Sequence, residues 1–298
     1  MSAPAQALEA FAPAKVNLTL HAGPPRADGY HPLHSLVVFA DWGDRLAAEP
    51  SDALSLSLIG PGAEGLRDDP HNLVLKAAWA LRAAAGRGEL GARLTLEKHL
   101  PVAAGLGGGS ADAAAALRLL NHLWELDFSL RQLAEIASVV GADVPACVWS
   151  RPLVMEGIGD KITPLAAWPE LHGLIANPGV AVATPDVFRA FDAQGGSGTL
   201  SANARLPVAG TLARALEIAA AGRNDLEAPA IALQPVIGEM LAALTALPGA
   251  RLARMSGSGA SAFALLESRE AADAAAAALA KAHPGWRVQA VSFAGAAS

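Results

Sequence analysis

The segment "PVAAGLGGGSADAAAALRLL", residues 101–120, places four glycines within five residues and continues directly into alanine and leucine. The stretch before it, "ARLTLEKHL", alternates apolar and polar side chains, which predicts a strand. A strand and a helix therefore abut the glycines with no spare residues, so a slack linker is disfavoured. We expect Ser110 to cap a helix that starts at Ala111 and exposes unpaired N–H donors, as anion-binding helices do. By itself this junction is equally compatible with an ordinary structural turn.

Three familiar motif interpretations fail on this segment. No Lys-Ser/Thr pair follows the glycines, so the loop is not a Walker loop, and Ser110 stands where the dinucleotide fingerprint requires Gly or Ala. The chain also has no G-x-S-x-G sequence, which removes the simplest hydrolase interpretation. A dinucleotide-dependent oxidoreductase is thus a distant alternative.

The composition predicts a globular protein with a small-molecule function. The 298 residues are 52% hydrophobic and 17% charged, and the formal net charge is -6 with no basic block, which disfavours nucleic-acid binding. The single cysteine, Cys147, is expected to be a buried residue of a reduced compartment. No basic residue precedes Lys15, and charges interrupt the alanine-rich helices, so we expect a cytoplasmic protein without a membrane span.

The first half of the chain carries clear strand and helix signals. "AKVNLTLHA", residues 14–22, alternates as a half-buried strand does, with Lys15 and Asn17 on one face. Ser129 and Gln132 form a capping box for a helix that should stop at Gly141. Val144 precedes Pro145 and is therefore biased away from a helix, which leaves Asp143 in a short loop. Other predicted elements are strands within 35–50, 53–62 and 92–100, and a helix at 73–85 between a cap at Asn72 and Gly86.

The second half, after a soft boundary near 155–165, is predicted as strands and helices around one linker-like tract. Thr184 is expected to cap a helix with Pro185 at its first position. The tract "AQGGSGTLSANARLP", residues 193–207, is expected to be a surface loop. The remaining predictions are a strand at 173–179, helices at 209–221, 235–246 and 269–282, a strand–turn–strand at 251–268 and a closing strand at 286–293.

Three ordered segments resemble the motifs of the GHMP kinases, the superfamily of galactokinase, homoserine kinase and mevalonate kinase. The loop from Pro101 to Ala114 resembles their ATP-binding loop, while "PAKVNLTL" and "MSGSGASAF" resemble their first and third motifs. "RADGYHPL", the triple glycine and "GADVP" are similar to the branch that phosphorylates the 2-hydroxyl of 4-diphosphocytidyl-2-C-methyl-D-erythritol in the non-mevalonate isoprenoid pathway. The resemblance covers residues 11–265.

The resemblance implies an α+β fold of two domains, residues 1–160 and 161–298. It implies a left-handed βαβ crossover and an active site between the domains. Whether the protein is a monomer or a homodimer is left open by the sequence. Implied ligands are ATP and Mg²⁺, with Ser110 as the residue that reaches the metal or phosphate. The implied catalytic residues are Lys15 and Asp143, the latter as a general base or as a group that only orients the hydroxyl.

The remaining implied site residues fall into two sets. The ATP-binding set comprises Asn72, Pro101, Ala104, Gly105, Leu106, Gly107, Gly108, Gly109, Ser110 and Ala111. The acceptor-binding set comprises Asn17, Tyr30, His31, Thr184, Phe188, Gly257, Ser258 and Gly259. Asn72 and Thr184 are equally well explained as helix caps, and the role of Asp112 stays open.

Two further alternatives remain on the residues alone. Another acceptor, homoserine or mevalonate, is disfavoured by "RADGYH". A non-catalytic metabolite sensor on the same fold would be expected to lack Lys15 or Asp143, and this chain has both. Ala103, Ala104 and Val37 depart from the family pattern, which leaves the fine shape of the cytidine pocket open.

Overall fold

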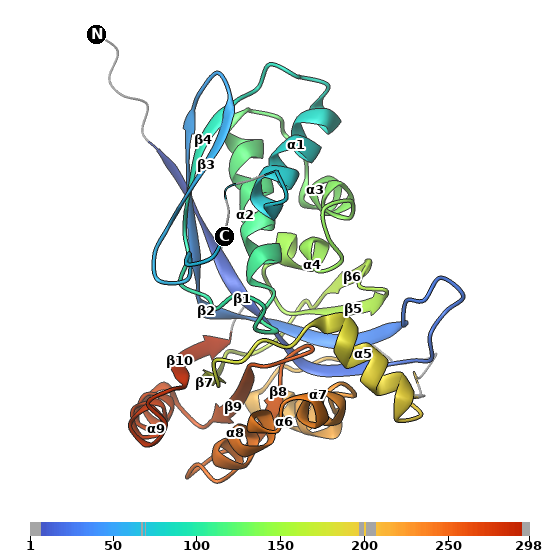
Figure 1. The fold of residues 1–298 in the computed structure, drawn as a ribbon, viewed down its shortest axis with the longest axis vertical. Coiled ribbons are helices and arrows are strands. Elements are labelled where there is room, and N and C mark those ends of the chain that lie inside the picture. The colour runs from blue at the N-terminus through green and yellow to red at the C-terminus, as the bar shows by residue number, and fades with distance from the viewer. Residues whose placement is uncertain (1–6, 67, 69, 197–199, 201–206, 294–298) are drawn as a thin grey trace. The chain divides into compact units, whose positions relative to one another are not determined.

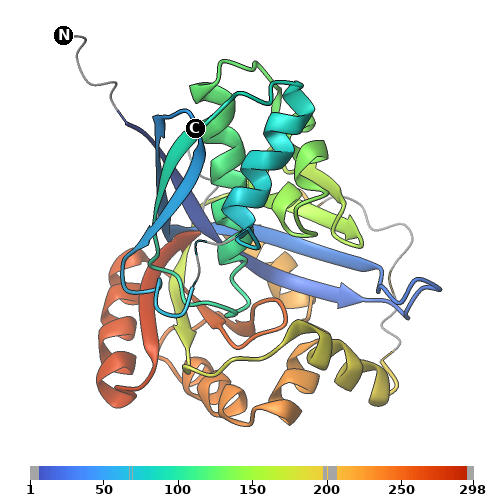
Figure 2. The ribbon, with the colours of Figure 1, turned by 45° about the horizontal axis from the view of Figure 1, so that its top comes forward.

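The computed structural model describes residues 7–66, 68, 70–196, 200 and 207–293. The chain divides into two compact units that interleave along the sequence. Unit 1 comprises the described residues up to Ala14, Gly43–Val102 and Gly107–Ser150, and unit 2 comprises Lys15–Trp42, Ala103–Leu106 and the described residues from Arg151 onward. The long strands β1 (Leu8–Ala22) and β2 (Leu33–Pro50) pair with each other, run side by side in both ribbon views (Figures 1 and 2), and contribute to both units. The division at residue 160 stays a prediction.

Unit 1 contains a strand–helix–strand crossover. Strand β3 (Leu54–Ile59) pairs in parallel with β4 (Ala92–Glu97), and α1 (Leu73–Ala85) lies between them in the chain. The end of β2 adds to β4 in antiparallel register. Helix α1 packs against α2 (Gly108–Leu123) and α3 (Leu130–Ala137), as Figure 1 shows. The helical connection between parallel strands agrees with the predicted βαβ crossover, whose handedness stays a prediction.

The predicted caps of α1 and α3 are confirmed. The Asn72 carboxamide accepts from the Val74 N–H at 3.0 Å, and Gly86 ends α1 in the left-handed conformation. Ser129 and Gln132 form the capping box of α3. That helix ends at Ala137, well before Gly141, and the Ser138 hydroxyl donates to the Glu135 carbonyl, which competes with continued helix bonding.

The predicted start of α2 is wrong. The helix begins at Gly108, and Gly107 precedes it with a φ of 61°, so Ser110 lies inside the first turn and makes no cap. Glycine adopts this left-handed conformation at little cost, and the chain therefore enters the helix before the serine. The Gly107 carbonyl accepts from the Ala111 N–H at 2.8 Å as the first helical bond.

The sequence also missed a short helix after Asp143. Helix α4 (Val144–Trp149) carries Pro145 in its first turn, with Asp143 at the N-cap position and no cap bond from its side chain. The expected bias of Val144 away from a helix is wrong, since Val144 is the first residue of α4. Proline is tolerated at the second position because first-turn N–H groups have no helical partner to lose. Cys147 of this helix is buried, as expected.

Unit 2 is an antiparallel sheet in the order β2-β10-β7-β9-β8, with β5 (Leu153–Gly157) on β2 and β6 (Lys161–Pro164) on β5. The strands predicted in the second half are confirmed as β7 (Leu171–Asn177), β8 (Leu252–Met255), β9 (Ala262–Leu266) and β10 (Arg287–Phe293). Helix α9 (Arg269–Ala282) matches its predicted range. The other helices are α5 (Thr184–Ala193), α6 (Leu212–Ala221), α7 (Glu227–Leu233) and α8 (Val236–Thr245), of which only α7 was missed.

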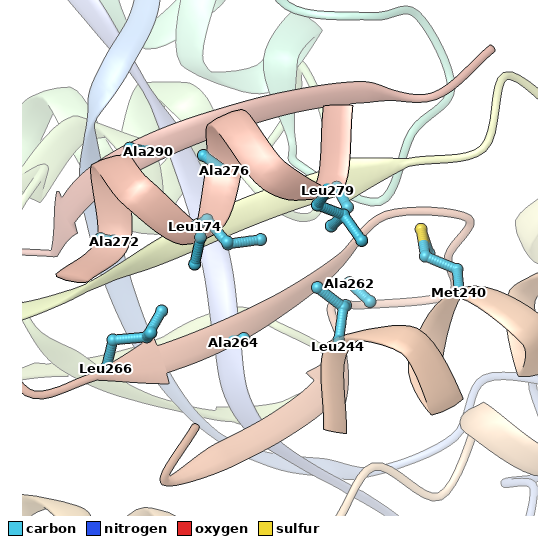
Figure 3. Close-up of a cluster of buried hydrophobic side chains, with 12 residues drawn as sticks. Leu174, Met240, Leu244, Ala262, Ala264, Leu266, Ala272, Ala276, Leu279 and Ala290 are labelled. Carbon is cyan, nitrogen blue, oxygen red and sulfur yellow. The ribbon is translucent and has the colours of Figure 1, made fainter. Parts of the chain in front are cut away.

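One face of this sheet is covered by α8 and α9. Figure 3 shows Leu279 of α9 and Met240 and Leu244 of α8 among buried side chains of β7 and β9. The small side chains of α9 allow the helix to approach the strands closely, and burial of this apolar surface stabilises the unit. Most of the predicted surface loop at 193–207 lies outside the described residues.

Strand β1 is more deeply buried than predicted. The alternation of residues 14–22 predicts one exposed face, but every residue from Ala12 to Leu20 is buried, including Lys15, Asn17 and Thr19. Buried polar side chains must find partners or stay available for a ligand. The polar face of β1 is therefore a candidate binding surface.

Candidate active site

Two glycine-rich segments of unit 2 lie in direct contact. Gly105 has a φ of 73°, and a Cβ there would lie 2.5 Å from the Ser256 carbonyl oxygen and 2.7 Å from that of Gly259, so only glycine fits. The Ser256 hydroxyl donates to the Gly105 carbonyl at 3.0 Å, and the Ser261 N–H donates to the Ala104 carbonyl at 3.0 Å. The structure thus joins the loop after Pro101 to the predicted acceptor loop at Gly257–Gly259.

Asn17 of β1 lies against the same segments. Its backbone N–H donates to the Ser256 hydroxyl at 3.2 Å, and its side-chain Nδ2 donates to the Ser35 hydroxyl at 2.7 Å. The Ser35 hydroxyl donates in turn to the Thr19 carbonyl at 2.6 Å. Within the described chain, the Asn17 Oδ1 is buried and has no hydrogen-bond partner. An acceptor atom is therefore left available in the unit.

The loop Gly257–Gly259 is held by residues that the sequence did not single out. The Asn224 side chain donates to the carbonyls of Met255 and Gly257 at 2.8 and 2.9 Å. Asn224, like Ser35, lies outside the three motif segments, so no local signal marked it. Ser256 lies within the third motif segment, "MSGSGASAF", but was not among the predicted site residues. Only the fold brings Asn224 to the loop.

Thr184 contacts the same loop through its hydroxyl. Helix α5 begins at Thr184, with Ala183 at the cap position, so the predicted cap is wrong. The Thr184 hydroxyl lies 2.8 Å from the Ser258 hydroxyl instead. Two acceptor-site candidates that are far apart in sequence are thus brought together.

Two of the three ring-bearing residues predicted to bind the acceptor, His31 and Phe188, lie against each other. The His31 ring stacks on Phe188 with centroids 4.8 Å apart and an interplanar angle of 24°. The His31 Nδ1 donates to the Gly23 carbonyl at 2.8 Å, because a carbonyl can only accept, and the Nε2 lies 3.4 Å from Asp192 Oδ2. Tyr30 is 58% exposed. Flat rings of this kind suit a nucleobase, with the Tyr30 ring accessible to solvent.

The two predicted catalytic residues lie in different units. Lys15 is 3% exposed in β1 of unit 2, and its backbone N–H donates to the Leu106 carbonyl at 2.9 Å. Asp143 lies in unit 1, immediately before α4. Their catalytic roles stay predictions.

Unit 1 contributes the helix start and a charged cluster beneath it. The Lys98 Nζ donates to Asp44 Oδ2 at 2.5 Å and to Asp112 Oδ2 at 2.7 Å, and all three side chains are buried. A Cβ at Gly108 would lie 3.4 Å from the Lys98 Nζ, so the ammonium lies directly under the first residue of α2. Asp44 Oδ1 accepts from the N–H groups of His99 and Leu100 at 2.5 and 2.8 Å. The side chain of Asp112, whose orientation the sequence left open, therefore faces Lys98.

Burial and charge shift the pKa values of this cluster. Burial, followed by the nearby Asp44 charge, raises the pKa of Asp112 to about 8, against the opposing effect of Lys98. Burial would lower the pKa of Lys98, but the carboxylates of Asp112 and Asp44 raise it above its usual value. Asp112 Oδ1 has no hydrogen-bond partner within the described residues. Two carboxylates share one ammonium, and burial makes Asp112 take up a proton more readily than an ordinary aspartate does.

Asn72, which is predicted to bind the nucleotide, lies at the start of α1 in unit 1. Asn72 is confirmed as a cap, and its predicted contact to adenine stays a prediction. Across the described ranges, no group of three or more His, Cys, Asp or Glu side chains is arranged to hold a metal ion.

Among the described residues, no helix is both long and apolar enough to span a membrane.

Comparisons with known proteins agree with this architecture. The model of the GHMP kinases N terminal domain matches residues 72–151, and that of the GHMP kinases C terminal matches residues 202–285. A 4-diphosphocytidyl-2-C-methyl-D-erythritol kinase of Cereibacter sphaeroides is 51% identical over 290 residues, 96% of this chain and 99% of the relative. One of Rhodopseudomonas palustris is 48% identical over 296 residues, 97% and 99% of the two chains.

Solved structures give the same result. A crystal structure of 4-(cytidine 5'-diphospho)-2C-methyl-D-erythritol kinase has a TM-score of 0.78 and 37% identity, covering 97% of this chain and 100% of that one. A homoserine kinase from Cytophaga hutchinsonii has a TM-score of 0.74 at 22% identity, covering 99% and 97%, which shows the fold alone. The predicted two-domain α+β fold is confirmed, and the homoserine and mevalonate alternatives are not favoured. The chain belongs to the 4-diphosphocytidyl-2-C-methyl-D-erythritol kinase family of the GHMP kinases.

Proposed function

We propose that this protein transfers the γ-phosphoryl group of ATP to the 2-hydroxyl of 4-diphosphocytidyl-2-C-methyl-D-erythritol. The observation that carries the proposal is the meeting of three motif segments at one hydroxyl: Ser256 accepts from the Asn17 N–H and donates to the Gly105 carbonyl. The names of relatives about 50% identical to this chain support the same acceptor. The proposed setting is the cytoplasm, with the protein as a monomer or homodimer.

In this proposal the glycine loop holds the phosphates of ATP. Gly107 turns the chain into α2, whose first N–H groups point out of the helix and favour a negative charge. Gly105 allows the backbone approach that any Cβ would prevent. Asn72 would lie beside the adenine while it caps α1.

The residues present fit Mg²⁺ as a companion of ATP. Mg²⁺ is commonly held by substrate phosphates with one or two protein ligands, so a preformed cluster of carboxylates is not needed. Ser110, in the first turn of α2, is the proposed side chain that reaches the metal or a phosphate. When bound, Mg²⁺ would neutralise charge on the β- and γ-phosphates.

Lys15 and Asp143 are proposed to act on the acceptor hydroxyl. Asp143 accepts or orients the hydroxyl proton, and Lys15 polarises the oxygen and stabilises the charge that develops on it. Positioning supplies about 7–11 kcal/mol of barrier reduction, whereas acid–base assistance supplies about 3–5 kcal/mol. The loops that position the two substrates should therefore contribute more to the rate than the base.

The acceptor is proposed to bind along unit 2. Tyr30, His31 and Phe188 provide flat faces for the cytosine. Thr184 and the loop Gly257–Gly259 provide hydroxyl and backbone donors for the diphosphate. Asn17 provides an amide oxygen for the methylerythritol part.

The direct test is turnover with purified full-length protein. ADP release should be followed with Mg-ATP and, separately, the cytidylated acceptor, homoserine, mevalonate or galactose, and phosphorus NMR should identify the new phosphomonoester. We expect turnover with the cytidylated acceptor alone. Turnover with another alcohol in its place would overturn the acceptor assignment, and no turnover with any acceptor would favour a sensor.

A further inference from the structure

The side-chain amide of Asn17 has one orientation, which is set by its hydrogen bond with the Ser35 hydroxyl. The Ser35 hydroxyl has a single proton, and the Thr19 carbonyl, 2.6 Å away, can only accept it. The hydroxyl oxygen must then accept from Asn17 at 2.7 Å, so the atom that faces it is the NH₂ nitrogen. Oδ1 is consequently turned away from Ser35.

The backbone of Asn17 is fixed by a second serine in the same way. The Ser256 hydroxyl gives its proton to the Gly105 carbonyl at 3.0 Å and accepts from the Asn17 N–H at 3.2 Å. Both hydroxyl protons are thus committed to backbone carbonyls. The position of Asn17 in β1 and the rotation of its amide are set independently.

The oxygen that remains is directed toward the acceptor loop. A Cβ at Gly257 would lie 3.4 Å from Asn17 Oδ1, so this oxygen faces the Gly257 backbone. Asn17 is fully buried, and within the part of the chain that the structure describes no group donates to Oδ1. A buried acceptor without a donor is costly, so Oδ1 requires a hydrogen-bond donor that the described residues do not supply.

We propose that Ser35 is a positioning residue that presents Asn17 Oδ1 to a hydroxyl group of the polyol part of the acceptor. The inference rests on the proposed function. It adds that Asn17 accepts a hydrogen bond from the substrate and does not donate one. An amide oxygen accepts a hydrogen bond from a hydroxyl group, whereas an ionised phosphate oxygen has no proton to give. The fixed amide therefore selects the hydroxyl-bearing end of the acceptor against its diphosphate. A flipped amide would present NH₂ and favour the phosphate instead.

The test compares variants at Ser35 in steady-state kinetics with both substrates varied. Ser35→Ala frees the amide to flip, and we expect the KM for the cytidylated acceptor to rise about tenfold or more while the KM for ATP changes by less than about twofold. Ser35→Thr keeps the hydroxyl on a β-branched side chain that suits a strand, and it should restore the acceptor KM. Ser35→Cys fills the same space with a weak acceptor and should resemble Ser35→Ala, which keeps the test usable if the alanine variant does not fold.

Ser150→Ala is the matched control. The Ser150 hydroxyl also donates to a carbonyl, that of Cys147 at 2.6 Å, and accepts from the Arg118 Nη1 at 3.2 Å, but it lies in unit 1. Its removal should lower thermal stability and leave both KM values unchanged.

Three results overturn the inference. The first is an unchanged acceptor KM in folded Ser35→Ala, the second is an equal rise in both KM values, and the third is a folded Ser35→Thr that does not restore the acceptor KM. A wild-type enzyme that turns over no cytidylated acceptor would instead refute the proposed function, so the two failures are distinguishable.

Discussion

The Lys98 ammonium and the Asp112 carboxylate are joined by a 2.7 Å hydrogen bond beneath the first turn of α2. The same ammonium neutralises Asp44, which in turn accepts two backbone N–H groups. The end of β4 and the start of α2 are thus held by one buried charge cluster.

Lys98→Met should be strongly destabilising. Among the described residues, Lys98 is the cation that pairs with Asp44 and Asp112, and its removal leaves two buried carboxyl groups, so we expect a loss of about 3–5 kcal/mol in the free energy of unfolding. Urea denaturation measures the loss. Lys76→Met is the control, because Lys76 is exposed on α1 and its loss should stay within about 0.5 kcal/mol. Equal effects of the two variants would refute the structural role of the cluster.

Asp112→Asn should change the pH dependence of stability. The folded-state pKa of Asp112 is raised from 3.8 to about 8, so the folded state binds the proton more tightly than the unfolded state. The stabilisation from this proton is complete below the unfolded pKa and is lost as the pH rises through the folded pKa. Asparagine cannot titrate, so the free energy of unfolding of the variant should rise relative to that of the wild type between about pH 5 and about pH 8. The rise should be at least about 1.4 kcal/mol, which corresponds to a shift of one pKa unit. Parallel stability curves over that range, from urea denaturation, would contradict the prediction.

Gly105→Ala should impair both stability and turnover. Its Cβ would meet the Ser256 and Gly259 carbonyl oxygens, and its φ is positive. Gly86→Ala is a matched control, because Gly86 has a similar φ of 65° with no atom within 4 Å of the added Cβ. The control should lose about 1 kcal/mol from backbone strain alone and keep its activity. The Gly105→Ala variant should lose clearly more of its free energy of unfolding than the control, and its KM for ATP should rise. Similar losses of stability in the two variants would mean that the contact of Gly105 with Ser256 and Gly259 is unimportant.

Asp143→Ala should lower kcat by about 10²- to 10⁴-fold and leave nucleotide binding nearly intact. Asp143→Asn separates the two roles, since an amide can orient a hydroxyl but cannot take its proton. A kcat close to that of the alanine variant would support a base, and a kcat close to wild type would support orientation only. Kinetics should be paired with a fluorescent ATP-analogue titration. Loss of ATP binding would show that Asp143 acts elsewhere.

Local sequence signals predicted those elements that depend on neighbouring residues. The caps at Asn72 and Ser129 and the range of α9 are set by side chains within one helical turn, and they are confirmed. The predicted caps of α2 and α5, Ser110 and Thr184, are wrong, because a side chain that is able to cap a helix does not always do so. In α2 the backbone freedom of Gly107 decided the start. In α5 the chain became helical at Thr184 itself.

Sequence alone was sufficient to determine the family, the glycine loop and the motif positions, because those depend on residue types at fixed spacing. The tertiary structure decided which partners the polar residues meet. Lys98, Asp44 and Asp112 form one cluster because β2, β4 and α2 converge in unit 1. Asn17 Oδ1 has no partner among the described residues, because Ser35 and Ser256, 18 and 239 residues away, commit their protons to backbone carbonyls. Such contacts depend on where distant strands and loops meet, and no spacing along the chain encodes them directly.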